Sequence, residues 1–306
     1  MQFSRRYEQN DSQANVQILY RRSCALIWLI GISLLDFGFA QLFKFGQNRG
    51  FHSHVVVSTN YLLLAAILST YLFLEDCFVL SRSGLITGLV TGSVFVASLF
   101  AMTSALSRAP GAAVFTAFRM SVAIPVAAGL ILWQEPSAPM QVVGVALALV
   151  ALGLMTSGMD ASYHIRRWKL FFILVAVFLL QGISHSCLRS VHYNGLDQEH
   201  LGILVVIGWT AGVIGWISIF LRGRRPRIPE LKLGAFIGIY NSLALTVFLI
   251  ALSKMPGTVV FPVLGCSVVL LDNLTAHFFW KEHLNYVARV GVGVAVIAIF
   301  LVVSAA

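Results

Sequence analysis

Four ionisable side chains lie inside long apolar stretches of this sequence, where charged groups are costly and are therefore functional candidates. Asp36 and Arg119 fall in two such stretches of the first half of the chain, and His185 and Asp272 fall in two of the second half. Asn241 adds an uncharged polar group in another apolar stretch. Together these groups could bind a polar solute or carry a coupling proton, so we take the five residues as candidate substrate-binding or coupling residues.

The positions of these residues within their apolar stretches predict one shared level in a membrane. With a helical rise of about 1.5 Å per residue, Asp36 lies about 18 Å into its helix, and Arg119 lies about 12 Å into a helix that runs the opposite way. Asp272 and Asn241 fall close to the same level. Two explanations stay open: an ion pair that only holds helices together, or a cluster that binds a polar substrate or a proton.

Other polar residues lie near this cluster or near helix ends. His185, with Gln181 and Arg189, either extends the polar path or is a hydrogen-bonded packing histidine. Arg189 and Lys44 lie near helix ends, from which long basic side chains reach the membrane surface.

The composition of the 306-residue chain requires a lipid environment. Hydrophobic residues make up 58% of the chain and charged residues 11%, whereas a soluble domain carries about a quarter charged residues. The mean hydropathy is +0.85. We therefore expect an all-α integral membrane protein with ten transmembrane helices, because only helices satisfy the backbone in such apolar stretches. These stretches lie near residues 23–45, 55–75, 84–106, 111–134, 138–157, 170–192, 201–221, 233–253, 257–280 and 286–305.

The net charge of +9 does not indicate nucleic acid, since the basic residues fall in loops and at helix ends. The four cysteines form no CxxC pair and are expected to be small buried residues. His52 and His54 form an HxH in a short loop with no carboxylate or thiol close in sequence, so no metal site is predicted. We expect no cofactor and no catalytic residue. The expected partners are a small-molecule substrate and the lipid bilayer, with the protein a monomer or homodimer.

A repeated segment indicates that one unit is written twice in the chain. Residues 104–115 read SALSRAPGAAVF and residues 250–261 read IALSKMPGTVVF, with seven of twelve positions identical and a separation of 146 residues. The correspondence continues through Gly88 and Gly234 upstream. Such duplication in an apolar chain is typical of transporter folds.

The repeat predicts the division of the chain. Each copy holds five helices, and an odd number makes the second copy enter the membrane inverted. Residues 170–192 are expected to correspond to residues 23–45, and so on along both copies. The predicted segments are a polar tail (1–22), a first five-helix repeat (23–157), a linker (158–169) and a second, inverted repeat (170–306).

Two prolines and two glutamates mark corresponding helices of the copies. Pro125 removes the hydrogen bond to the carbonyl of Ser121 and should kink its helix, and Pro262 is placed similarly in the second copy. Glu135 and Glu282 end these helices, and we expect solvated carboxylates there, with a contact between the repeats as the alternative.

The chain resembles the drug/metabolite transporter superfamily, and within it the ten-helix EamA-type transporters. The residues that carry the resemblance are the turns ALSRAPG (105–111) and ALSKMPG (251–257), the segment FRMSVAIPVAAGLILWQE (118–135) and the helix start QVVG (141–144). The second copy departs from the pattern at residues 268–272, where the family usually has a proline-containing segment. The resemblance implies a central cavity lined by helices one, three, four, six, eight and nine.

The expected function is a secondary transporter that moves a small polar metabolite by alternating access, coupled to protons or working by exchange. No P-loop for nucleotide hydrolysis is present. The alternatives are an intramembrane enzyme, although neither HExxH nor GxSxG occurs, and a non-transporting membrane scaffold. We expect a multi-pass protein of a bacterial inner membrane. Its orientation stays open, because members of the family usually keep both termini in the cytosol, whereas most Lys and Arg residues lie on the side opposite the N-terminus.

Overall fold

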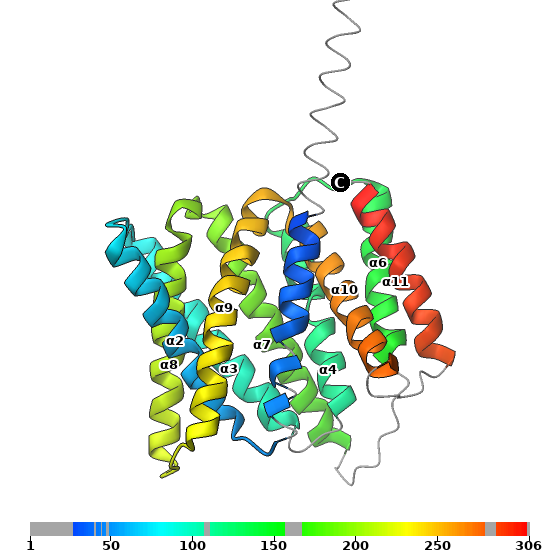
Figure 1. Cartoon of the computed structure of the whole chain (residues 1–306). Helices are drawn as coiled ribbons and strands as arrows, with labels where there is room; N and C mark the ends of the chain where they lie inside the picture. Colours follow the sequence, from blue (N-terminus) through cyan, green and yellow to red (C-terminus); the bar gives the residue numbers. More distant parts are fainter. Residues whose placement is uncertain are drawn as a thin grey trace, which may run out of the picture.

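The computed structural model describes residues 27–39, 41–43, 45–46, 49–106, 111–156, 167–278 and 286–304, with some helical side chains excepted. This part of the chain is all-α, and Figure 1 shows it as a bundle of helices. Residues 27–39 form the first helix. Ten labelled α-helices follow in the described residues: α2 (Ser53–Leu74), α3 (Arg82–Leu106), α4 (Gly111–Met120), α5 (Ala123–Ile131), α6 (Pro139–Thr156), α7 (Arg167–Tyr193), α8 (His200–Leu221), α9 (Ile228–Lys254), α10 (Gly257–Phe278) and α11 (Tyr286–Ser304).

The helices support a multi-pass membrane protein. Five segments are long and apolar enough to cross a bilayer: Ser53–Leu74, Arg82–Ala105, Phe172–Tyr193, Asp197–Leu221 and Ile228–Lys254. The remaining apolar helices are shorter, and the ten-span topology therefore stays a prediction. The first helix begins and α11 ends at the same end of the bundle, as an even number of crossings requires (Figure 1).

Elements far apart in the sequence pack against one another. α2 lies along α8, and α6 lies along α11. α3 packs against α7 and α8, while α2 also packs against α9. The first helix, α4, α7, α9 and α10 meet in the middle of the bundle, where side chains from each of them line one cavity.

The predicted kink at Pro125 is confirmed as a break between two helices. α4 ends at Met120 and α5 begins at Ala123, with a turn at Ser121 and Val122. Proline has no N–H to donate to the carbonyl of Ser121, and that carbonyl instead accepts a hydrogen bond of 3.0 Å from the N–H of Ile124. At Pro262, by contrast, α10 continues unbroken to Phe278.

Glycines set the close approach of α3 to α8 and of α9 to α2. A Cβ atom added at Gly92 would lie 2.8 Å from the carbonyl oxygen of Ile207, and one added at Gly238 would lie 2.7 Å from that of Asn60. Both distances are too short for a nonbonded contact, so the helices would have to shift before a larger residue could fit. Both glycines therefore have a packing role, since they let the helix backbones approach closely.

Alanine at Gly92 or Gly238 should therefore destabilise the protein. Alanine favours a helix over glycine by about 1 kcal/mol, but overpacking a tight contact costs about 1–3 kcal/mol. Gly293→Ala in α11 is the matched control, because a Cβ atom there meets nothing within 4 Å. We expect thermal unfolding in detergent to show a lowered midpoint for the first two variants and an unchanged or raised one for the control. Equal midpoints for all three would contradict the argument.

Candidate functional site

A cavity in the middle of the bundle brings together four of the five candidate residues. Asp36 of the first helix, Arg119 of α4, His185 of α7 and Asn241 of α9 all line it. The cavity holds about 1110 Å³ of space, including the part that opens to solvent. The fifth candidate, Asp272, belongs to α10, but its side chain lies outside the described residues.

The charged pair in this cavity is an ion pair with a hydrogen bond. Arg119 Nη1 lies 2.9 Å from Asp36 Oδ2. The predicted pairing of Arg119 with a carboxylate at its own depth is confirmed in Asp36, and it compensates a guanidinium that would be costly alone in a membrane. The Asp36 side chain is 37% exposed and that of Arg119 is 10% exposed. The carboxylate is therefore the more accessible partner.

A chain of hydrogen-bonded polar side chains connects α3 with α7 beside this pair. Ser98 Oγ donates a hydrogen bond of 2.6 Å to Gln181 Oε1, and Gln181 Nε2 lies 2.9 Å from His185 Nε2. The Gln181 amide oxygen accepts from Ser98, and the amide nitrogen of Gln181 faces His185 Nε2. The His185 ring also stacks on Phe261, with centroids 5.5 Å apart. His185 is thus a hydrogen-bonded packing residue that also lines the cavity, and its role in coupling stays a prediction.

Aromatic side chains form a large part of the remaining cavity wall, and sequence reasoning missed them. In a chain with 22 phenylalanines, no local pattern separates those that face a cavity from those that face lipid. The only local signal is the spacing of Phe39 and Phe43, one helical turn apart, whose ring centroids are 5.0 Å apart. The aromatic lining residues are Phe39, Phe43, Tyr61, Phe95, Phe118 and Phe248.

The expectation of a solvated carboxylate at Glu135 is wrong, because its side chain is 0% exposed. Its Oε1 accepts hydrogen bonds from Arg189 Nε at 3.0 Å, from the Tyr193 hydroxyl at 2.8 Å and from the Gly257 N–H at 3.1 Å. Its Oε2 accepts one from the Thr258 N–H at 2.9 Å. The carboxylate therefore joins the loop after α5 to α7 and to the start of α10. We call Glu135, Arg189 and Tyr193, with the backbone groups they bind, the Glu135 clasp.

Arg189 is also buried, so the expectation that its charge reaches the membrane surface is wrong. Its side chain is 2% exposed, and Nη1 donates to the carbonyl of Leu252 and, at 3.0 Å, to that of Met255. These carbonyls lie at the end of α9, where helical partners are lacking. Trp133 stacks on Tyr193 with ring centroids 4.7 Å apart and covers the clasp. Sequence reasoning raised a contact between the predicted repeats only as the alternative for Glu135, and the clasp joins this glutamate to Arg189 and Thr258 in the second half of the chain.

The surroundings of Glu135 favour its charged form. Burial alone would raise the pKa of this carboxyl group. The Thr258 N–H, the Tyr193 hydroxyl and the Arg189 guanidinium together hold its pKa below the usual value. The clasp is consequently a fully charged, hydrogen-bonded pair at neutral pH.

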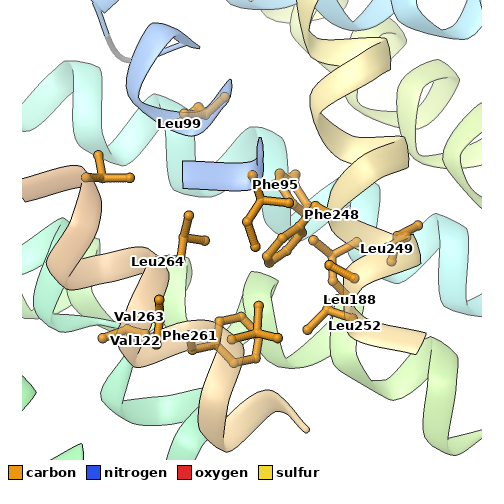
Figure 2. Close-up of a cluster of buried hydrophobic side chains, with 14 of the residues drawn as sticks. Phe95, Leu99, Val122, Leu188, Phe248, Leu249, Leu252, Phe261, Val263 and Leu264 are labelled. Carbon is orange, nitrogen blue, oxygen red and sulfur yellow. The ribbon is translucent and has the colours of Figure 1, made fainter. Parts of the chain in front are cut away.

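An apolar layer separates the clasp from the cavity. Along α9, Phe248 lines the cavity, Leu252 follows one turn later, and Met255 meets the clasp. Along α10, Leu264 lines the cavity and Phe261 lies between it and the clasp. Figure 2 shows Phe248, Leu252, Phe261 and Leu264 gathered between the helices. An apolar layer and a buried ion pair therefore lie between the cavity and this end of the bundle.

Comparisons with known proteins show the fold and no family. No family model matches the chain, and no curated protein matches it. Its fold is similar to that of a solved structure, described only as the crystal structure of a protein, with a TM-score of 0.71 over 91% of this chain and 96% of that chain. The two sequences are 13% identical, so the likeness establishes the fold alone.

Several residues named in the sequence analysis lie outside the described residues. These are Lys44, Glu282, the turn 107–110, the tail 1–22 and nearly all of the linker 158–169. Within the described part of the chain, no group of three or more His, Cys, Asp or Glu side chains is placed to hold a metal ion.

Proposed function

We propose that the protein is a secondary transporter that moves a small polar solute by alternating access through the central cavity. The observation that carries the proposal is the convergence of Asp36, Arg119, His185 and Asn241 around open space between membrane helices. Protein interiors are normally filled by side chains, and polar groups inside a membrane protein mark solute or proton paths.

The cavity wall favours a particular form of solute. The accessible carboxylate of Asp36, with Arg119 behind it, offers a polar contact at one point of the wall. The aromatic side chains around it offer flat apolar contacts. A small metabolite with a polar or charged group and an apolar body fits this combination.

The packing of the glycine helices supports an inverted repeat of the EamA type. Gly92 of α3 meets Ile207 of α8, and Gly238 of α9 meets Asn60 of α2. The two glycines are 146 residues apart and their partners 147 residues apart, close to the separation of the repeated motifs. A twofold relation between two five-helix units accounts for this agreement.

The Glu135 clasp supports alternating access. The apolar layer and the buried pair close one end of the cavity, and they involve the loop after α5, α7 and the junction of α9 with α10. Access from one side at a time requires such a closure, and movement of α7 relative to α10 would release it.

Flux measurements in liposomes test the proposal. Purified protein would be reconstituted, and the exchange or net uptake of radiolabelled amphipathic metabolites would be followed. Saturable flux that exceeds that of empty liposomes supports transport. Formation of a chemically altered product would favour an intramembrane enzyme, and neither flux nor product across metabolite classes would favour a scaffold.

Coupling to protons is a separate prediction at Asp36. Asp36→Asn should remove the dependence of flux on an imposed pH gradient while the protein stays folded, because the carboxylate is the accessible titratable partner in the cavity. Asp197→Asn is the matched control, since that carboxylate pairs with His192 outside this cavity. If wild-type flux ignores the gradient, or if Asp36→Asn keeps the full dependence, exchange becomes the better account.

A further inference from the structure

A strongly basic loop at the other end of the bundle takes no part in the proposed transport site. Between α8 and α9, four of six residues are arginines, and all four are exposed: Arg222, Arg224, Arg225 and Arg227. Within the described residues none of the ion pairs involves them. Glu230, in the first turn of α9, is fully buried and accepts the backbone N–H groups of His52 and Arg227. The positive charge of the loop is therefore largely uncompensated.

The HxH motif at the start of α2 holds two of these guanidinium groups. Arg224 Nη1 lies 2.8 Å from His52 Nδ1 and 3.2 Å from His52 Nε2, and Arg222 Nη1 lies 3.2 Å from His54 Nε2. An arginine can only donate, so in each contact an imidazole nitrogen accepts. The two histidines thus orient neighbouring guanidiniums without neutralising them.

The loop lies at the boundary between the apolar and polar parts of the surface. Phe220 and Leu221 directly before it are 84% and 78% exposed, and Ile228 directly after it is 69% exposed. Such side chains at the ends of membrane helices face lipid. The arginines between them therefore lie at the level of the lipid headgroups.

Within the described residues, the acidic side chains of the connections between helices gather at the end opposite the basic loop, where Arg82 and Lys254 also lie. The acidic residues of the α2–α3 and α7–α8 connections lie at the far end, because α2 and α8 both run between that end and the loop (Figure 1). These residues are Glu75, Asp76, Asp197 and Glu199. Arg49 and Lys232, both exposed, add to the basic end, where Gly46 lies against Leu233.

We propose that Arg222 and Arg224, held by His54 and His52, form a binding site for the phosphate headgroup of an anionic phospholipid. Guanidinium groups match phosphate geometry with paired hydrogen bonds. A lipid fits better than a soluble anion because the apolar residues beside the loop would contact its acyl chains. The site would hold this end of the protein at an anionic leaflet, which agrees with the Lys and Arg distribution and not with the family's usual orientation.

Titration of purified, detergent-solubilised protein with lipids tests this site. Binding would be followed by native mass spectrometry and thermal unfolding with phosphatidylglycerol, phosphatidylcholine and inorganic phosphate as separate ligands. We expect phosphatidylglycerol to bind at least about tenfold more tightly than phosphatidylcholine. The R222Q/R224Q variant should lose about 10- to 30-fold of that affinity, as expected for two basic residues at an anionic surface. The control variant R82Q/K254Q, which removes two exposed cations at the far end, should change it less than about twofold.

A variant that keeps all four arginines distinguishes a specific binding site from non-specific electrostatic attraction. His52→Ala keeps all four arginines, so a loss of about threefold or more in affinity for phosphatidylglycerol supports the positioning role of the histidine. If His52→Ala binds phosphatidylglycerol as tightly as the wild type does, the proposed site is wrong. Equal losses of affinity in R222Q/R224Q and R82Q/K254Q would also contradict it. If inorganic phosphate stabilises the protein as much as phosphatidylglycerol does at the same concentration, the ligand is a soluble anion and not a lipid. If R222Q/R224Q does not fold, Arg224→Gln alone replaces it.

Discussion

Replacement of Glu135 by glutamine should destabilise the protein by about 3–5 kcal/mol, the usual cost of removing one partner from a buried ion pair. The variant leaves Arg189 as a charge in a site where its side chain is 2% exposed, and it weakens the hydrogen bonds from the Gly257 and Thr258 N–H groups. Chemical denaturation or thermal unfolding in detergent measures the loss.

Two further variants test the reason for this loss. Glu75→Gln is the matched control, because Glu75 is an exposed carboxylate at the same end of the bundle and should cost little. The double variant Glu135→Gln/Arg189→Met removes both charges and should recover part of the stability. If Glu75→Gln costs as much as Glu135→Gln, the burial argument is wrong.

The pH dependence of stability provides an independent measure of the same carboxylate. The pKa of Glu135 is held below its usual value, so its contribution is complete above about pH 4.3, where an unfolded glutamate is charged. That contribution is lost as the pH falls through the lower pKa of the folded state. We therefore expect the stability difference between wild type and Glu135→Gln to be constant near neutral pH and to narrow below about pH 4. A difference that widens on acidification would contradict this sign.

Charge reversal of Asp36 should damage folding by at least about 2.5 kcal/mol, the lower end of the cost of placing an additional arginine in a membrane interior. In Asp36→Arg two guanidinium groups would meet where Arg119 now lies 2.9 Å from a carboxylate. The swapped variant Asp36→Arg/Arg119→Asp restores opposite charges across the same gap and should recover part of the yield and of the thermal midpoint.

The coupling between the two positions is what this experiment measures. The single variants Asp36→Arg and Arg119→Asp are measured beside the double variant. If the double variant loses less stability than the two single variants lose together, the two side chains interact directly. A double variant as unstable as that sum would show that each residue depends on other neighbours. Flux through the swapped variant, measured beside its stability, separates a structural ion pair from a substrate contact.

The positions of the helices and the pairing of Arg119 could be predicted from the sequence. The lipid environment requires helical backbone in apolar stretches and a partner for a buried charge. Apolar stretches of about 20 residues must be helical in lipid, and the proline at position 125 cannot complete the hydrogen bond to Ser121. An arginine within such a stretch needs a carboxylate at its own depth, and Asp36 was one of two at that level. The sequence thus determined the elements, the break in the fourth stretch and one ion pair.

The tertiary structure alone decided which helix faces meet. Glu135 and Arg189 are 54 residues apart, and Arg224 and His52 are 172 residues apart, so neither pair leaves a periodic pattern in the sequence. Glu135 looked like an ordinary charged helix end because nothing near it in sequence reveals that the start of α10 and Tyr193 enclose it. The aromatic wall of the cavity is hidden for the same reason. In a membrane helix apolar residues cover every face, and only the packing of the bundle separates those that meet lipid from those that meet a solute.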